Sequence, residues 1–146
     1  MAHMKIAIAA DHGGVELKDA LVQKFSALGI TDLGTHGSDS VDYPDFGAAL
    51  AKRVASGEFD RGILICGSGI GISIAANKIK GIRAALCHNA YTAEMARRHN
   101  DANIIAMGGR VVDEATATAM TELFLNTEFE GGRHARRVEK ISALEK

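Results

Sequence analysis

The chain has 146 residues, of which 47% are hydrophobic and 24% are charged, and its formal net charge is -1 at pH 7. These values are typical of one globular domain and exclude a disordered or fibrous chain. The near-neutral charge gives no support for nucleic acid or a membrane as a partner, and no apolar run approaches the ~20 residues of a membrane span. Because a second methionine follows Met1-Ala2-His3, we expect residues 1–4 to be an expression scar and start methionine, and residues 5–146 to form a single domain.

Short β-rich runs alternate with longer helical ones along the first half of the chain. Residues 5–10 (KIAIAA) predict a buried strand, and the apolar residues of 15–28 recur at helical spacing up to a glycine that suits a helix end. Residues 30–33 predict a second strand. A second helix is expected over 44–56, because it begins on a proline and ends at a glycine.

The second half continues the alternation. The ranges expected to form strands are 62–66, 82–87 and 103–107. The segments expected to form helices are 70–78, 91–99, a run capped by Asp113, and 133–145. Five strand–helix units in strict alternation predict an α/β fold, namely a Rossmann-like three-layer sandwich with a five-stranded parallel sheet in the order 2-1-3-4-5.

Two unusual loops fall where such a sheet binds ligands. Ligands bind beyond the carboxyl ends of the strands, where the winding reverses, which for this order lies between the first and third strands. The loops expected there are 11–14 (DHGG) and 67–71 (GSGIG). The sequence therefore predicts a binding crevice at these two loops.

The glycine loop 67–71 is suited to an anion. Its glycines allow backbone N–H groups to approach a ligand, and the following helix N-terminus favours negative charge. A tight strand–helix turn explains the same glycines and stays open as an alternative. No GxxxxGK is present, and no acidic residue stands at 87–89, so neither a P-loop nor a dinucleotide site is supported.

Two cysteines follow the third and fourth predicted strands. Cys66 directly precedes the glycine loop, and a thiol at a helix N-terminus can have its pKa lowered to ~3.5–7.5. The alternative is a small buried hydrophobic residue, which is what we expect of Cys87. With no secretory signal recognised, we expect both thiols to be reduced in a cytoplasmic protein.

Histidines and arginines supply further candidates. His12 falls inside the predicted crevice, and His99 is expected to end a helix, where it binds a ligand or is solvated. Arg133 and Arg137 are four residues apart, so they share a helical face that matches a phosphate or is simply solvated, and Arg110 could join an anion site. No HExxH or clustered Cys/His spacing is present, which disfavours a metal. Together these groups predict a small phosphorylated substrate.

Residues 62–78 carry the most specific pattern. Their sequence, GILICGSGIGISIAANK, closely resembles the signature of type B ribose-5-phosphate isomerases, in the family that also holds galactose-6-phosphate isomerase subunits. Four further motifs match that family in order and spacing, namely DHGG at 11–14, DYP at 42–44, HNDAN at 99–103 and EGGRH at 130–134. The resemblance covers essentially the whole expected domain.

This family interconverts aldose and ketose phosphates through a cis-enediolate without a metal or an organic cofactor. The resemblance implies that Cys66 is the base and that Ser68 and the neighbouring amides stabilise the oxyanion. It also implies that His99 aids opening of the furanose ring, with Asp11 as a candidate helper. The residues that it implies for substrate binding are Asp11, His12, Tyr43, Gly67, Gly69, Ile70, Gly71, Asn100, Arg110, Arg133 and Arg137.

The resemblance leaves some points open. One branch of the family uses a glutamate instead of the cysteine, but that position here is Ile72, so the base falls to Cys66; Ser68 stands where threonine is common. The family forms dimers with shared active sites, which implies a homodimer here and leaves a tetramer open. A six-carbon substrate, allose or galactose 6-phosphate, is the first alternative to ribose 5-phosphate. A non-catalytic phosphate- or nucleotide-binding module is the second.

Overall fold

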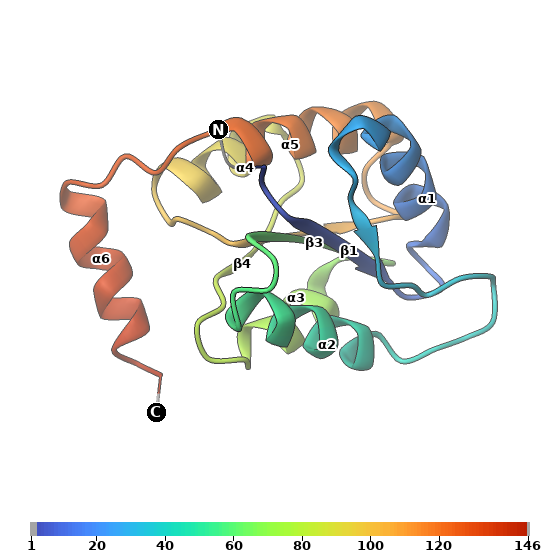
Figure 1. The fold of residues 1–146 in the computed structure, drawn as a ribbon, viewed down its shortest axis with the longest axis horizontal. Helices are drawn as coiled ribbons and strands as arrows, with labels where there is room; N and C mark the ends of the chain where they lie inside the picture. Colours follow the sequence, from blue (N-terminus) through green and yellow to red (C-terminus); the bar gives the residue numbers. More distant parts are fainter. Residues whose placement is uncertain (1–2, 146) are drawn as a thin grey trace.

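The computed structural model describes residues 3–145, which form one parallel sheet between two layers of helices (Figure 1). The strands are β1 (Ile6–Ala10), β2 (Thr31–Asp32), β3 (Arg61–Cys66), β4 (Ala84–Leu86) and β5 (Ile104–Gly108). The helices are α1 (Val15–Lys24), the short 3₁₀ helix η1 (Ser26–Leu28), α2 (Tyr43–Ala55), α3 (Ile70–Asn77), α4 (Ala90–Arg98), α5 (Glu114–Asn126) and α6 (Arg133–Ser142). Met1 and Ala2 of the expected scar lie outside the described residues.

The expected α/β fold is confirmed, but the expected strand order is wrong at its end. The sheet runs β2-β1-β3-β5-β4, not 2-1-3-4-5. β5 is buried throughout and pairs with β3 along five residues, whereas β4 is partly exposed and pairs along only three. Placing the longer apolar strand in the middle and the shorter one at the edge buries more apolar surface.

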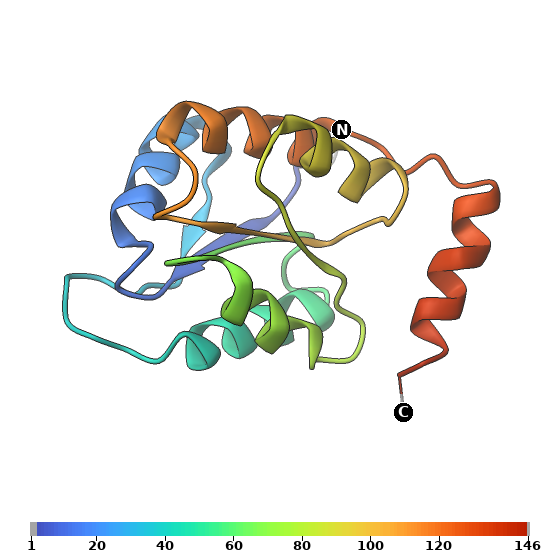
Figure 2. The ribbon, with the colours of Figure 1, turned by 180° about the vertical axis from the view of Figure 1, so that it is seen from behind.

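Helices α1, α4 and α5 cover one face of the sheet, and α2 and α3 cover the other (Figures 1 and 2). Successive strand residues point to opposite faces, so the buried side chains separate into two clusters. In β1, for example, Ile8 faces α1 and α5, whereas Ala7 and Ala9 face α2 and α3. Burial on both faces explains why the strands are continuous apolar runs instead of alternating ones.

Helix α6 stands apart from both layers, beyond an extended segment that follows α5 (Figure 1). The apolar residues near its end remain exposed, with Ile141 45% and Leu144 77% accessible. No helix within residues 3–145 is long and apolar enough to cross a membrane. An amphipathic helix held away from its own core is the arrangement expected when another protein surface covers it.

A buried lysine joins α1 to the edge strand β2. The ammonium of Lys18 lies 2.7 Å from the carboxylates of both Asp19 and Asp32. Burial lowers the pKa of Lys18, but the hydrogen bonds to both carboxylates outweigh this and raise its pKa above the usual value. Asp32 also accepts a hydrogen bond from the backbone N–H of Gly34. The pair therefore helps to hold the loop that leads from β2 to α2.

We expect Asp32→Asn to lower the free energy of unfolding by about 1–3 kcal/mol, because the buried ammonium would keep a single, exposed carboxylate partner. The raised folded-state pKa of Lys18 means that this contribution is present at neutral pH and is lost as the pH rises through that pKa. The matched control is Asp19→Asn, whose side chain is 61% exposed and whose loss should cost about 0.5 kcal/mol or less. Urea unfolding at pH 7 measures both, and equal losses would contradict this assignment.

Candidate active site

Cys66 is the last residue of β3 and lies at the carboxyl edge of the sheet, between β1 and β5. Its side chain is only 4% exposed. The backbone N–H of Gly69 donates to its Sγ at 3.2 Å, which holds the sulfur against the start of α3. The sequence therefore correctly predicted a thiol at the junction of a strand, a glycine loop and a helix.

Glycines let three strand ends meet at this point. Gly69 has φ +80°, and a Cβ there would lie 2.7 Å from the carbonyl carbon of Met107 in β5. A Cβ on Gly109 would lie 2.6 Å from the carbonyl oxygen of Gly13, in the loop after β1. Larger residues would push these loops apart, because such distances are well inside van der Waals contact. The loops after β1, β3 and β5 therefore form one continuous backbone surface.

Polar side chains surround this surface. A Cβ on Gly71 would lie 2.5 Å from the ring of Tyr43, and one on Gly67 would lie 2.9 Å from a guanidinium nitrogen of Arg110, so both side chains contact the glycine loop. Asp11 is buried, with 6% exposed, and its carboxylate accepts a hydrogen bond from a loop N–H at 2.9 Å. The crevice thus combines a thiol, a carboxylate, a phenol and a guanidinium.

His12 also belongs to this crevice. Its Nδ1 accepts a hydrogen bond from the backbone N–H of Val41 at 3.2 Å. A backbone N–H can only donate, so Nδ1 acts as the acceptor and the proton of the neutral ring lies on Nε2. The expected site residues gathered around the crevice are Asp11, His12, Tyr43, Cys66, Gly67, Ser68, Gly69, Ile70, Gly71 and Arg110.

The remaining expected site residues lie at the opposite edge of the sheet. His99 caps the end of α4, and the loop that follows it reaches the amino end of β3, where the carbonyl of Asn103 accepts from Gly62 N–H at 2.9 Å. Cys66 is four residues further along that strand, or about 13 Å at ~3.3 Å per residue. The members of this distant group are His99, Asn100, Arg133 and Arg137. One chain therefore does not bring its cysteine and its histidine together.

A histidine that the sequence did not single out packs on His99. The ring of His134, at the start of α6, stacks on that of His99 with centroids 4.1 Å apart and planes 12° from parallel. His134 is 6% exposed, and its Nε2 lies 3.6 Å from a carboxylate oxygen of Glu130. Burial, then His99 and Arg133, lower the pKa of His134, and Glu130 opposes them. At neutral pH the ring is therefore neutral.

These groups are also the ones that come nearest to a metal site within residues 3–145. The ligand atoms of His99, Glu130 and His134 lie within 4.8 Å of one another. However, the two rings are stacked and nearly parallel, so their nitrogen lone pairs lie in two separate, near-parallel planes and do not converge on one ion. We therefore assign these residues no metal.

Three charged side chains hold the loop that carries His99. Asp101 has the left-handed φ of +47° and accepts hydrogen bonds from the guanidinium groups of Arg97, at 2.9 Å, and Arg83, at 3.4 Å. Arg83 also donates to the carbonyl of Asn100 at 3.2 Å. Arg97 and Asp101 are four residues apart, but α4 ends at Arg98, so helical spacing alone does not predict this contact.

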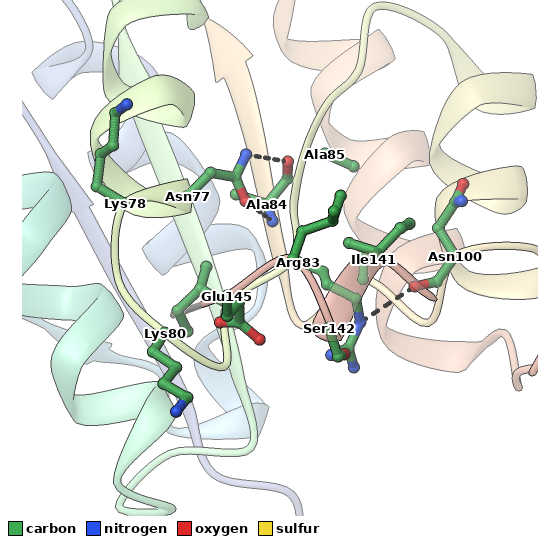
Figure 3. Close-up of a pocket in the computed structure, with 13 residues that line it drawn as sticks. Asn77, Lys78, Lys80, Arg83, Ala84, Ala85, Asn100, Ile141, Ser142 and Glu145 are labelled. Carbon is green, nitrogen blue, oxygen red and sulfur yellow. Dashed lines mark hydrogen bonds between the residues drawn. The ribbon is translucent and has the colours of Figure 1, made fainter. Parts of the chain in front are cut away.

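A cavity of about 660 Å³ opens beside this distant group (Figure 3). Residues near the end of α6, Ile141 and Leu144, line one side, and β4 and the end of α3 line the other. Asn100 reaches the cavity, whereas Cys66 is not among its lining residues. This cavity therefore adjoins the distant half of the expected site.

Cys87 behaves as the sequence predicted. It is buried and belongs to the cluster facing α1 and α5, whereas Cys66 belongs to the cluster on the other face of the sheet. Burial raises the pKa of the Cys87 thiol to about 11. The two thiols are therefore separated by the sheet and do not form a disulfide with each other.

Similarity to known proteins extends over almost the whole chain. A family model described as Ribose/Galactose Isomerase matches residues 6–141. Ribose-5-phosphate isomerase B of Escherichia coli strain K12 is 48% identical over 143 residues, which cover 97% of this chain and 96% of the relative. A protein named D-erythrulose-4-phosphate isomerase, from Pectobacterium atrosepticum, is 41% identical over 146 residues, with 97% and 95% covered. The solved structure of ribose-5-phosphate isomerase B from Clostridium thermocellum superimposes with a TM-score of 0.95 at 56% identity, covering 97% of each chain.

Proposed function

The chain belongs to the ribose/galactose isomerase family, and on that premise we propose that it interconverts ribose 5-phosphate and ribulose 5-phosphate. The observation that carries this proposal is the buried thiol of Cys66 under a loop of backbone amides. Proton transfer between adjacent carbons needs a positioned base and donors for the oxygen that gains charge, and we assign these roles to the thiol and to the loop amides. The names of the relatives with high identity agree with this substrate.

We propose that Cys66 is the base. As a thiolate it takes the proton from C2 of the open-chain aldose, the electron pair forms the C1–C2 double bond, and O1 becomes the enediolate oxygen. Protonation of C1 by the Cys66 thiol, whose proton exchanges with solvent, and transfer of the O2 hydroxyl proton to O1 then give the ketose. Ser68 Oγ accepts from the Ile70 N–H at 3.2 Å, so its own hydrogen can donate to the enediolate oxygen alongside the loop amides.

The active form would be a homodimer with shared sites. The buried core separates Cys66 from His99 within one chain, so no small sugar phosphate can contact both. A second copy that supplies His99 and Asn100 would complete the site, with His99 opening the furanose ring. It would also supply Arg133 and Arg137, which would bind the phosphate together with Arg110 and His12. The exposed apolar end of α6 is the surface that such a partner would cover.

The substrate test is a panel of aldose phosphates compared by kcat/KM. We expect ribose 5-phosphate to exceed allose 6-phosphate and galactose 6-phosphate by at least about tenfold, because one misfitting carbon costs ~1–3 kcal/mol in a shaped pocket. The panel should include D-erythrose 4-phosphate, since one relative is named for the four-carbon ketose. A higher kcat/KM for any four- or six-carbon phosphate would overturn the pentose assignment. Binding of mononucleotides without isomerase activity would overturn the enzyme itself.

A further inference from the structure

We propose that His134 is a positioning residue for His99, whose ring plane it sets by stacking. This inference rests on the proposed function, because it deepens the role of His99 in opening the sugar ring. It concerns a residue that does not itself reach the substrate, since only 6% of it is exposed. The contact that carries it is the near-parallel stack of the two rings at 4.1 Å.

His99 needs such support because of where it lies. It is the residue after the last turn of α4, with its backbone N–H bonded to the Met95 carbonyl at 2.9 Å. That bond holds the backbone and leaves the two side-chain torsions free. A group that removes and delivers a sugar proton must point one nitrogen along a defined direction, and small misplacements cost large factors in rate. A ring packed face to face restricts this direction.

The position of His134 is itself fixed by hydrogen bonds that join the end of α4 to the start of α6. Glu130 accepts from Arg98 Nε at 2.7 Å, and its backbone N–H donates to the Arg98 carbonyl at 3.1 Å. His134 is four residues after Glu130, and its backbone N–H donates to the Gly131 carbonyl at 3.1 Å. These bonds hold the segment before α6 against the end of α4. The first residues of α6 therefore lie next to His99. Removing the His134 ring would release His99 without breaking these backbone bonds.

The surroundings of the pair favour a neutral supporting ring. Burial lowers the pKa of His134 most, the charges of His99, Arg133 and Arg137 lower it further, and Glu130 opposes them. A neutral neighbour avoids repelling a proton held by His99 during ring opening. The essential property of His134 is then its flat aromatic face, and phenylalanine should replace it better than an aliphatic residue can.

The test separates ring opening from proton transfer. Ribose 5-phosphate cyclises, whereas ribulose 5-phosphate is acyclic, because its 5-hydroxyl carries the phosphate. We therefore compare turnover of ribose 5-phosphate with exchange of the C1 proton of ribulose 5-phosphate in deuterated water, followed by NMR. We expect His134→Ala to lower kcat for ribose 5-phosphate by about tenfold while C1 exchange stays within about twofold of the unsubstituted protein. His134→Phe should recover most of the turnover.

Each other outcome has a distinct meaning. Equal losses in both assays would show a general structural role and overturn the proposal, as would unchanged turnover in His134→Ala. A phenylalanine variant as slow as the alanine variant would also overturn it, because stacking would then not be the essential contact. Circular dichroism confirms that both variants fold. If the unsubstituted protein lacked both activities, or if His99→Asn kept full turnover, the proposed function would fail first, and independently of His134.

Discussion

Replacing Cys66 with alanine should lower kcat for ribose 5-phosphate by about 10²–10⁴-fold, the usual contribution of a positioned acid–base group. The side chain is small and buried, and alanine fits the same space among Leu64, Ile72 and Ala106. The variant should therefore fold and should still bind the sugar phosphate. Exchange of the C1 proton of ribulose 5-phosphate should fall by the same factor, because that exchange depends on the same base. A coupled assay and NMR measure the two rates.

The chain offers a matched control for this substitution. Cys87 is buried to a similar degree, but it lies on the other face of the sheet, away from the crevice. Cys87→Ala should leave both rates unchanged within about twofold, because removing a buried thiol there changes packing alone. Near-normal turnover in Cys66→Ala would contradict the proposed base. Equal losses in the two cysteine variants would point to packing instead of chemistry.

Local patterns predicted the elements better than their pairing. The strand at 5–10 and the helix over 133–145 correspond to β1 and α6 within a few residues, because apolar periodicity and glycine punctuation are local. The expected strand at 82–87 shrinks to Ala84–Leu86 and moves to the sheet edge. The swapped positions of β4 and β5 depend on which strand buries more surface against β3. No window of neighbouring residues contains this information.

The candidate site was predictable in its parts. The glycine loop beside Cys66 is local, so sequence reasoning identified it directly. The distance of His99 from that loop also follows from a rule, since a helix between parallel strands runs back toward their amino ends. A residue that ends such a helix must lie at the opposite edge. The stack of His134 on His99 has no such signal, because it depends on how the segment after α5 returns to α4.

Two inactive variants should restore activity when they share a dimer. In a heterodimer of Cys66→Ala and His99→Asn subunits, one site would hold both defects and the other would hold neither. We therefore expect about half of the unsubstituted activity per dimer, as two-fold symmetry with shared sites requires. Each homodimer should be nearly inactive toward ribose 5-phosphate. Two different affinity tags allow the heterodimer to be purified and assayed by itself.

The reciprocal heterodimer makes this result decisive. A subunit carrying both substitutions, paired with an unsubstituted subunit, would place one defect in each shared site and should be nearly inactive. If each chain instead supplied a complete site, the two results would exchange, with the double-variant heterodimer half active and the mixed one inactive. The two pairings contain the same substitutions in the same number, so stability and expression affect them alike. The two pairings differ only in whether each active site takes Cys66 and His99 from one subunit or from both. The separation of Cys66 from His99 by a buried strand predicts that each site takes them from both.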